Sequence, residues 1–289
     1  MTFLSRATLN GASQVFLQEH QGCGLLILVA IGLHDPGLLA GALLGLLAGT
    51  ITAWRCGCLR RDIEAGLYGY NAALLGLLIA LMLGVTAQAA LLVMFSSALS
   101  VPLQRWLLGR MRERASLPGY TLVFVLMGWV VLMLCGLLGD VVAARTAEPR
   151  LDGWGALGGI LQGVGQVLFL PDPAAGLCLL VALLLANRRA GLWTLCGSAV
   201  GIYVALLTGD SASRALAGLA GYNPALAALA LSQIHRSALK PALGISLAII
   251  FWVLFNQLDV PPLTMPFILA CWAVALGDGL YRSRADATI

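Results

Sequence analysis

Long apolar runs fill most of the chain, and short polar or glycine-rich segments interrupt them at intervals. Runs such as "VFVLMGWVVLMLCGLLG" lack the polar and apolar alternation of a membrane strand, so they predict membrane-crossing helices. Ten spans are expected, at roughly 12–33, 37–53, 70–86, 89–106, 119–139, 157–186, 191–208, 222–234, 242–256 and 263–281. The predicted fold class is an all-α polytopic membrane protein.

The composition agrees with this assignment. The chain is 60% hydrophobic and 10% charged, which leaves too little polar surface for a soluble globule. Most of the seven cysteines lie inside apolar runs, where cysteine behaves as a small hydrophobic residue, so no disulfide framework is expected. Cys56 and Cys58 in "RCGCLR" have no second cysteine pair and no nearby histidine, so neither a metal site nor a cofactor is predicted.

The sequence contains an internal repeat. The segment "GLYGYNAALLGLLIAL" from Gly66 resembles "GLAGYNPALAALAL" from Gly218. An offset of 152 positions relates Gln14 to Gln166, Gly24 to Gly176, Gly45 to Gly197, Gly49 to Gly201, Tyr70 to Tyr222 and Asn71 to Asn223. Later the offset is 143, which relates "GYTLVF" to "PLTMPF". Two repeats of five spans are predicted, 1–145 and 146–289, and the odd number of spans inverts the second relative to the first.

Basic residues predict the orientation. If the N-terminus is cytoplasmic, all but Arg145, Arg150 and Arg214 of the 17 Lys and Arg residues fall on the cytoplasmic side, as membrane proteins prefer. Both termini are therefore expected in the cytoplasm, with the chain in the plasma (inner) membrane. The first ~20 residues lack an apolar stretch followed by a cleavage site, so the N-terminus is expected to be retained.

Two segments, "RRDIEAGLYGYN" and "GDSASRALAGLAGYN", are poor candidates for spans. Each begins with residues that favour helix starts and ends near glycine, so re-entrant half-helices are predicted at 62–71 and 210–223. Non-helical backbone at membrane depth lies inside protein or beside a polar cavity, which predicts the GYN motifs at the centre of a pore. Asn71 and Asn223 are expected to cap the helices that restart there. The glycines at 45, 49, 197 and 201 are expected to pack helices closely.

The predicted pore would favour a particular solute. A half-helix that ends near the midplane exposes unpaired carbonyl groups and a partial negative charge, which attract N–H donors. No charged side chain is predicted deep in a span, so nothing there would offset the dehydration of an ion. A small neutral solute rich in N–H groups is therefore expected.

The paired motifs resemble those of the urea transporter family of passive urea channels, over nearly the whole chain. The resemblance rests on "GLYGYNAALLG" and "GLAGYNPALAALA", preceded by "GASQVFL" and "QGVGQVLFL" and followed by "PGYTLVF" and "PPLTMPF". It implies a homotrimer in which each subunit has its own pore between two inverted halves. Urea and membrane lipid are the implied partners, with no nucleic acid. The resemblance also implies that urea is held flat between apolar walls while its amide hydrogens follow oxygen acceptors.

The resemblance further implies which residues contact urea. Gln14 and Gln166 would stand at the two wider ends of the filter. Thr121 and Thr264 would supply hydroxyls at its centre. The walls would come from Tyr70, Tyr222, Leu74, Leu226, Leu17 and Phe169. The chain departs from the family pattern in carrying tyrosine instead of phenylalanine in both GYN motifs, and leucine instead of an aromatic residue at position 17.

Other functions fit the sequence less well. An aquaporin-like channel is suggested by "NPA" at Asn223, but the first half reads "NAA" and ten spans exceed that family's six. An ammonium channel would need pore histidines, whereas His20, His34 and His235 fall near loops. An ion-coupled small-amide carrier would need a charged residue within the membrane. An enzyme is not expected, because no nucleophile and base or metal cluster shares a predicted cavity.

Overall fold

The computed structural model describes residues 2–113, 117–138, 153–209 and 212–286, and within these ranges every regular element is a helix. The all-α prediction is confirmed. The N-terminal part, up to residue 138, contains α1 (Phe3–Gln14), α2 (Gln21–His34), α3 (Pro36–Arg55), α4 (Arg60–Glu64), α5 (Tyr70–Leu83), α6 (Ala87–Glu113) and α7 (Leu122–Leu138). The C-terminal part, from residue 153, contains α8 (Gly153–Gly165), the 3-10 helix η1 (Gln166–Leu168), α9 (Pro173–Ala186), α10 (Arg188–Leu207), α11 (Ala212–Leu216), α12 (Tyr222–Ile234), α13 (Leu239–Gln257) and α14 (Met265–Asp286). The predicted boundary at 145 and 146 lies outside the described residues.

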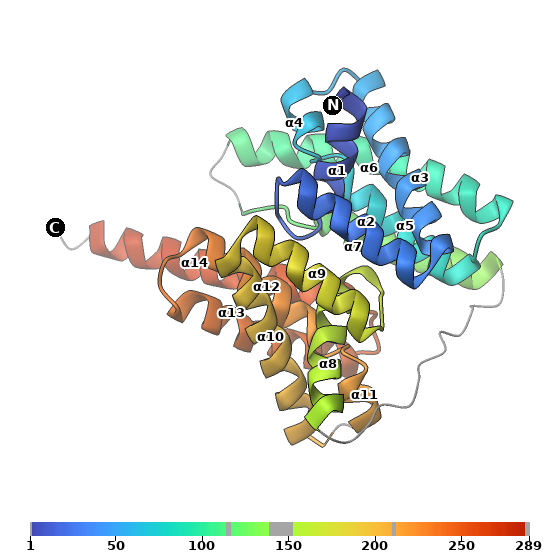
Figure 1. The fold of residues 1–289 in the computed structure, drawn as a ribbon. Helices are drawn as coiled ribbons and strands as arrows, with labels where there is room; N and C mark the ends of the chain where they lie inside the picture. The colour runs from blue at the N-terminus through green and yellow to red at the C-terminus, as the bar shows by residue number, and fades with distance from the viewer. Residues whose placement is uncertain (1, 114–116, 139–152, 210–211, 287–289) are drawn as a thin grey trace.

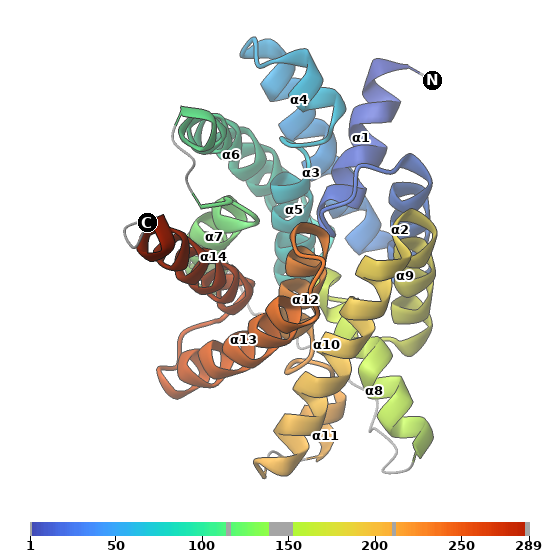
Figure 2. The ribbon, with the colours of Figure 1, turned by 90° about the vertical axis from the view of Figure 1, so that its left-hand side faces the viewer.

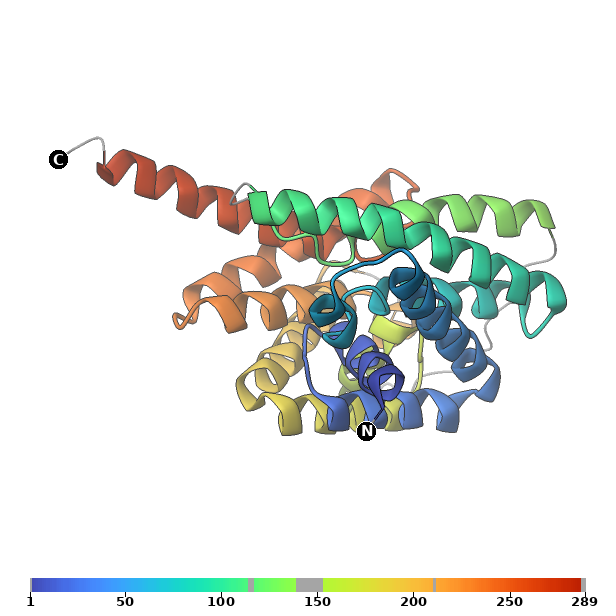
Figure 3. The same ribbon diagram turned by 90° about the horizontal axis from the view of Figure 1, so that it is seen from above.

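The two parts form neighbouring groups of helices, with α5 and α12 near the middle (Figures 1 and 2). The helices α2 and α9 pack side by side across the boundary, where the Cys178 thiol lies 3.7 Å from the Leu26 carbonyl oxygen. The C-terminal end of α14 projects beyond the other helices (Figure 3). The contact region between the two parts is therefore built from matching elements of each.

Four described helices, α3, α6, α10 and α13, are long and apolar enough to cross a membrane on their own. A fifth candidate is the pair formed by α8 with η1 and α9, which is bent by 74°. Four more apolar helices, α2, α5, α7 and α14, have shorter apolar stretches. By this measure the chain has the helices of an integral membrane protein, and the count of ten spans stays a prediction.

Two of the predicted spans are wrong as single helices. In place of one helix over 12–33, α1 ends at Gln14 and α2 begins at Gln21. In place of one helix over 157–186, the chain turns sharply between η1 and α9. Apolar residues run up to Leu17 and Leu170, and the polar or proline-containing segments that follow (18–20 and 171–172) are short, so the hydropathy of each whole stretch did not reveal the break.

Backbone conformation and capping explain both breaks. Leu17 and Phe169 have left-handed backbone, with φ of 55° and 60°, a conformation that ends helices. The His20 Nδ1 atom then accepts a hydrogen bond from the first turn of α2 at 2.9 Å, and Asp172 Oδ1 accepts one from the first turn of α9 at 3.1 Å. A new helix therefore starts in a new direction shortly after each break.

The predicted half-helices at 62–71 and 210–223 are also wrong as continuous helices, and residues 210–211 lie outside the described part. The helices α4 and α11 have five residues each, and turns separate them from α5 and α12. Gly66 and Gly218 form these turns with φ of 81° and 82°. A Cβ atom on Gly66 would lie 2.3 Å from a backbone nitrogen of α1, and one on Gly218 would lie 2.6 Å from a backbone nitrogen of α8. Glycine therefore allows each turn to pack directly on the preceding helix.

The expected close packing at the paired glycines is confirmed. A Cβ atom on Gly45 would lie 2.1 Å from the Ala72 carbonyl oxygen, and one on Gly197 would lie 2.4 Å from that of Pro224. These contacts bring α3 against α5 and α10 against α12. The central helices α5 and α12 are consequently held at backbone distance by their neighbours.

Two tryptophans connect the parts and allow a test. The Trp129 indole donates to the Pro261 carbonyl oxygen at 2.8 Å, and the Trp272 indole donates to that of Pro118 at the same distance. Replacing either with phenylalanine keeps an aromatic ring and removes the donor. Each variant should lower the free energy of unfolding by about 1 kcal/mol, and this can be followed by thermal melting in detergent. The exposed Trp106 offers a matched control, and equal melting of Trp106→Phe, Trp129→Phe and Trp272→Phe would contradict the role.

Candidate functional site

Two threonine hydroxyls meet at the contact between the parts. Thr121 Oγ1 and Thr264 Oγ1 lie 2.7 Å apart, and either hydroxyl can donate. Both residues are buried, and each directly precedes the first helical turn of α7 or α14. The structure thus brings together two predicted site residues that stand 143 positions apart in the sequence.

Asn71 and Asn223 hold the helices that follow these threonines. The Oδ1 atom of Asn71 accepts from the Phe124 amide, and that of Asn223 accepts from the Phe267 amide, each at 3.1 Å. The expectation that these asparagines cap α5 and α12 is therefore wrong, since their side chains cap the first turns of α7 and α14 instead. Gly69 and Gly221, the residues before α5 and α12, already have helical backbone, and no side chain caps the first turn of either helix.

The tyrosines of the two GYN motifs contact the same loops. Tyr70 donates its hydroxyl to the Tyr120 carbonyl oxygen at 2.5 Å, and Tyr222 donates to that of Leu263 at 2.7 Å. Both acceptor residues have φ of 42°. This backbone conformation costs a non-glycine residue on the order of 1–3 kcal/mol and persists where surrounding contacts fix it. In each GYN motif, the asparagine therefore holds the first turn of α7 or α14, and the tyrosine holds the residue with positive φ that precedes the threonine.

Gln14 is the last residue of α1, and Gln166 follows the last residue of α8 and begins η1. The Gln14 Nε2 atom donates to the Ala65 carbonyl oxygen at 3.0 Å, and that of Gln166 donates to Ala217 at 2.8 Å. A carbonyl oxygen can only accept, so this contact fixes which end of each amide carries the nitrogen. Each Oε1 atom is then the end that remains to accept an N–H group from a solute.

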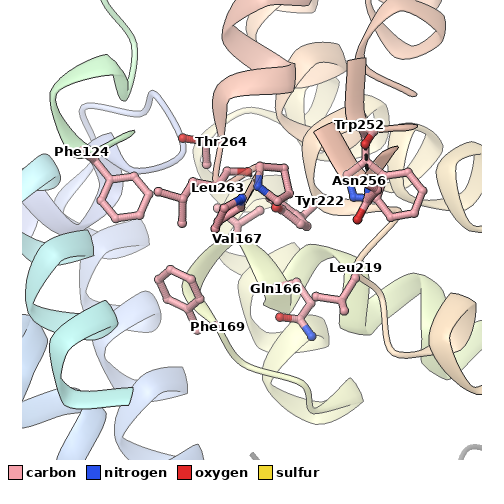
Figure 4. A pocket seen from close by; sticks show the side chains of 12 residues that line it. Phe124, Gln166, Val167, Phe169, Leu219, Tyr222, Trp252, Asn256, Leu263 and Thr264 are labelled. Carbon is pink, nitrogen blue, oxygen red and sulfur yellow. Dashed lines mark hydrogen bonds between the residues drawn. The ribbon is translucent and has the colours of Figure 1, made fainter. Parts of the chain in front are cut away.

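A cavity of about 230 Å³ lies beside Thr264, and residues of the C-terminal part form most of its lining. Four predicted site residues line it, namely Gln166, Phe169, Tyr222 and Thr264, and Phe124 and Trp252 are among the others (Figure 4). A single water needs about 10–15 Å³ of such a cavity, so this space can hold several waters or a small solute. Apolar surface dominates the cavity, and a small number of oxygen acceptors interrupts it.

The remaining predicted residues do not line this cavity. Leu74 and Leu226 are fully buried in the apolar core, and Leu17 packs against that core. Tyr70 and Thr121 are also buried. Gln14 is only partly buried, like Gln166 in the other part. The chamber is thus lined by predicted residues of the C-terminal part, whereas Tyr70, Leu74 and Thr121 of the N-terminal part are packed in the interior.

Aromatic contacts beside the threonines include residues that were missed. The Phe124 and Phe169 rings lie 6.3 Å apart edge to face, and the Tyr120 and Phe267 rings lie 4.8 Å apart. In the N-terminal part Leu17 stands at the position that matches Phe169 and carries no ring. Tyr120 supplies the aromatic ring that packs on Phe267 there. The signal was present in the sequence, because Phe124 and Phe267 already matched in "GYTLVF" and "PLTMPF".

Charged side chains are almost absent from the buried part of the described structure. Asp62 is the one buried charged residue there, and both its oxygens accept from Arg112, at 2.7 and 2.8 Å. Among the described residues, no three His, Cys, Asp or Glu side chains gather as a metal site requires. The groups around the threonine pair are neutral, so they can recognise a solute by hydrogen bonds and shape.

Comparison with known proteins agrees with the motifs. A family model described as "Urea transporter" matches residues 5–279. Urea transporter 1 of Ovis aries and that of Capra hircus are each 30% identical over 296 residues, which covers 91% of this chain and 74% of the relative. Urea transporter 1 of Mus musculus is 29% identical over 264 residues, covering 81% and 66% respectively. Because the family model spans nearly the whole chain, the chain belongs to the urea transporter family.

Proposed function

We propose that this protein conducts urea passively, as a channel, between the two parts of the chain. Membership of the family makes it a membrane transporter for urea rather than an enzyme. The observation that carries the channel mechanism is the set of neutral acceptors. Each glutamine amide donates its nitrogen to a backbone carbonyl and keeps its oxygen as an acceptor, and the two threonine hydroxyls lie 2.7 Å apart. Such weak, successive sites favour rapid passage, because a single tight site would retain the solute.

The chemistry of urea fits these groups. Urea carries four N–H donors and one carbonyl in a flat neutral molecule, so acceptors along its path replace its hydration while apolar walls exclude ions. The rings of Phe124 and Phe169 beside the chamber, together with Tyr222, supply such walls. We assign urea contacts to the paired positions at 14 and 166, 17 and 169, 70 and 222, 74 and 226, and 121 and 264.

We further propose an arrangement in the membrane. Ten helices, α2, α3, α5, α6 and α7 with α9, α10, α12, α13 and α14, would form the spans of two inverted repeats. The helices α1 and α8 would be the re-entrant half-helices, because α1 ends at Gln14, α8 ends one residue before Gln166, and a break follows each glutamine. Both termini would lie in the cytoplasm, with the chain in the plasma (inner) membrane. Three copies surrounded by lipid would each contain one pathway.

Urea flux into proteoliposomes tests this function. Stopped-flow light scattering should show rapid urea entry that a protonophore leaves unchanged, with little entry of glycerol. Glycerol entry as fast as urea entry would favour an aquaporin-like pore. Urea entry that collapses with the ion gradient would instead establish a coupled carrier.

Replacing Gln166 with alanine tests the role of the amide oxygen. Loss of one hydrogen bond of about 0.5–1.5 kcal/mol should weaken the binding of urea analogues roughly two- to tenfold. Subunit assembly and melting should change less than analogue binding. The exposed Gln257 provides the control variant Gln257→Ala. Analogue inhibition equal to that of the unmodified protein would mean that Gln166 serves packing alone.

A further inference from the structure

The proposed pathway uses the rings of Tyr70 and Tyr222 as walls and leaves their hydroxyls without a role. Each hydroxyl donates to the carbonyl oxygen of the residue directly before a central threonine, at 2.5 Å for Tyr120 and 2.7 Å for Leu263. Phenylalanine at either tyrosine position would leave this carbonyl without that donor. The two tyrosines therefore do something that the aromatic ring alone cannot do.

We propose that the two hydroxyls are positioning groups that hold the central threonines, and that they set urea permeability and its selectivity over bulkier amides. This inference rests on the proposed urea channel. The carbonyl of Tyr120 belongs to the peptide unit that joins it to Thr121, so fixing the carbonyl direction fixes the start of Thr121. The same holds for Leu263 and Thr264.

The backbone at these positions needs such a contact. Tyr120 and Leu263 both have φ of 42°, a region that non-glycine residues rarely adopt unless surrounding groups fix it. Each carbonyl is held by a tyrosine whose own backbone is anchored in α5 or α12. We call the contact of Tyr70 with the Tyr120 carbonyl the N-terminal clamp and that of Tyr222 with the Leu263 carbonyl the C-terminal clamp. The residues that follow the two clamped carbonyls are the central threonines, whose hydroxyls lie 2.7 Å apart.

The two clamps differ in their second donor. The Leu263 carbonyl also accepts from Asn223 Nδ2 at 3.1 Å, so it keeps a partner when the Tyr222 hydroxyl is removed. Asn71 Nδ2 instead donates to Gln104 Oε1 at 3.1 Å. Within the described structure, the hydroxyl of Tyr70 is therefore the side-chain donor on which the Tyr120 carbonyl depends.

Gln104 makes the N-terminal clamp more sensitive still. Its Nε2 atom donates to the Tyr70 hydroxyl at 3.2 Å, and the side chain is buried. Asn256, which lies 152 positions later, is exposed and donates instead to the Trp252 carbonyl oxygen. Removing the Tyr70 hydroxyl thus deprives the buried Gln104 amide and the partly buried Tyr120 carbonyl of a partner, whereas removing the Tyr222 hydroxyl leaves Leu263 with Asn223.

The test compares three tyrosine-to-phenylalanine variants by urea flux into proteoliposomes. Tyr70→Phe should slow urea flux about fivefold or more, and Tyr222→Phe should slow it about twofold or less, because only the first change leaves the Tyr120 carbonyl and the buried Gln104 amide without their partner. Tyr203→Phe is the matched control, since Tyr203 is 62% exposed, and its flux should be unchanged. Equal flux in all four proteins would overturn the clamp.

Selectivity and coupling separate positioning from general stability. The ratio of N-methylurea flux to urea flux should rise in Tyr70→Phe and stay constant in Tyr203→Phe. In a Thr121→Val/Thr264→Val background, Tyr70→Phe should change urea flux less than about twofold, because its effect passes through the threonine hydroxyls. An undiminished effect in that background would overturn the proposal.

Two further outcomes are decisive. If Tyr70→Phe does not fold, Tyr222→Phe must raise the N-methylurea to urea ratio above that of Tyr203→Phe, and equal ratios would overturn the clamp. Unmodified protein that conducts no urea would refute the channel itself. Normal flux in the unmodified protein together with normal flux and selectivity in Tyr70→Phe would refute only the clamp.

Discussion

Replacing both central threonines with valine should slow urea flux about tenfold or more. Valine keeps the shape of threonine and removes the hydroxyls of Thr121 and Thr264, which lie 2.7 Å apart in the buried contact between the parts. An N–H group of urea would then cross this point without an acceptor, at a cost of about 1–3 kcal/mol. The measurement is stopped-flow urea entry at matched protein content.

Thr208→Val is the control for this replacement. Thr208 is exposed at the end of α10, and its hydroxyl donates to the Val204 carbonyl of its own helix at 3.0 Å. Urea flux through the Thr208→Val variant should equal that of the unmodified protein. Unchanged flux in the double threonine variant would remove the hydroxyls from the proposed acceptor path.

The same threonines should couple in stability. Thr121→Val alone leaves the Thr264 hydroxyl buried without its partner, whereas the double variant removes both polar groups. The double variant should therefore lose less stability than the sum of the two single variants. Thermal melting in detergent measures this difference, and strictly additive losses would contradict a direct hydroxyl contact.

Replacing Gly24 with alanine should have the largest effect on folding. A Cβ atom there would lie 1.9 Å from the Leu9 carbonyl oxygen, and a Cβ atom on Gly176 would lie equally close to that of Leu161. These atoms belong to the backbones of α1 and α8, which cannot move aside as a flexible side chain can. Each variant should lose about 3 kcal/mol or more of stability, with low yield and early melting.

Gly136→Ala provides the comparison for the glycine variants. Gly136 lies in α7, and a Cβ atom on it would meet nothing within 4 Å. Its yield and melting should match those of the unmodified protein. Melting of Gly24→Ala at the same temperature as Gly136→Ala would show that α1 does not pack on α2 as described.

Several features of the site could be predicted from the sequence because paired motifs marked them. The threonines, asparagines and tyrosines recur at fixed offsets, and the structure brings Thr121 to Thr264 and gives Asn71 and Asn223 equivalent acceptor roles. Their partners could not be predicted, because a hydrogen bond between α5 and α7 depends on how two distant segments pack. The expected capping of α5 and α12 was wrong for this reason.

The breaks after Gln14 and Gln166 show the limit of hydropathy. Apolar residues continue through Leu17 and Phe169, so composition predicts one span where the chain changes direction. A left-handed residue has no reliable signature when it is leucine or phenylalanine, because glycine and asparagine are the residues that normally mark that conformation. The signal that remained was the capping group a few residues later, at His20 and Asp172.

The sequence by itself determined that the chain is an all-helical membrane protein, that its motifs occur in pairs, and that it resembles urea transporters, because composition and fixed spacing carry that information. Only the tertiary structure decided where the helices break, which carbonyl each tyrosine holds and that the two threonines touch. Hydropathy records how much apolar surface a segment must bury. The direction of a turn and the partner of a buried polar group are set by contacts between segments that lie far apart along the chain.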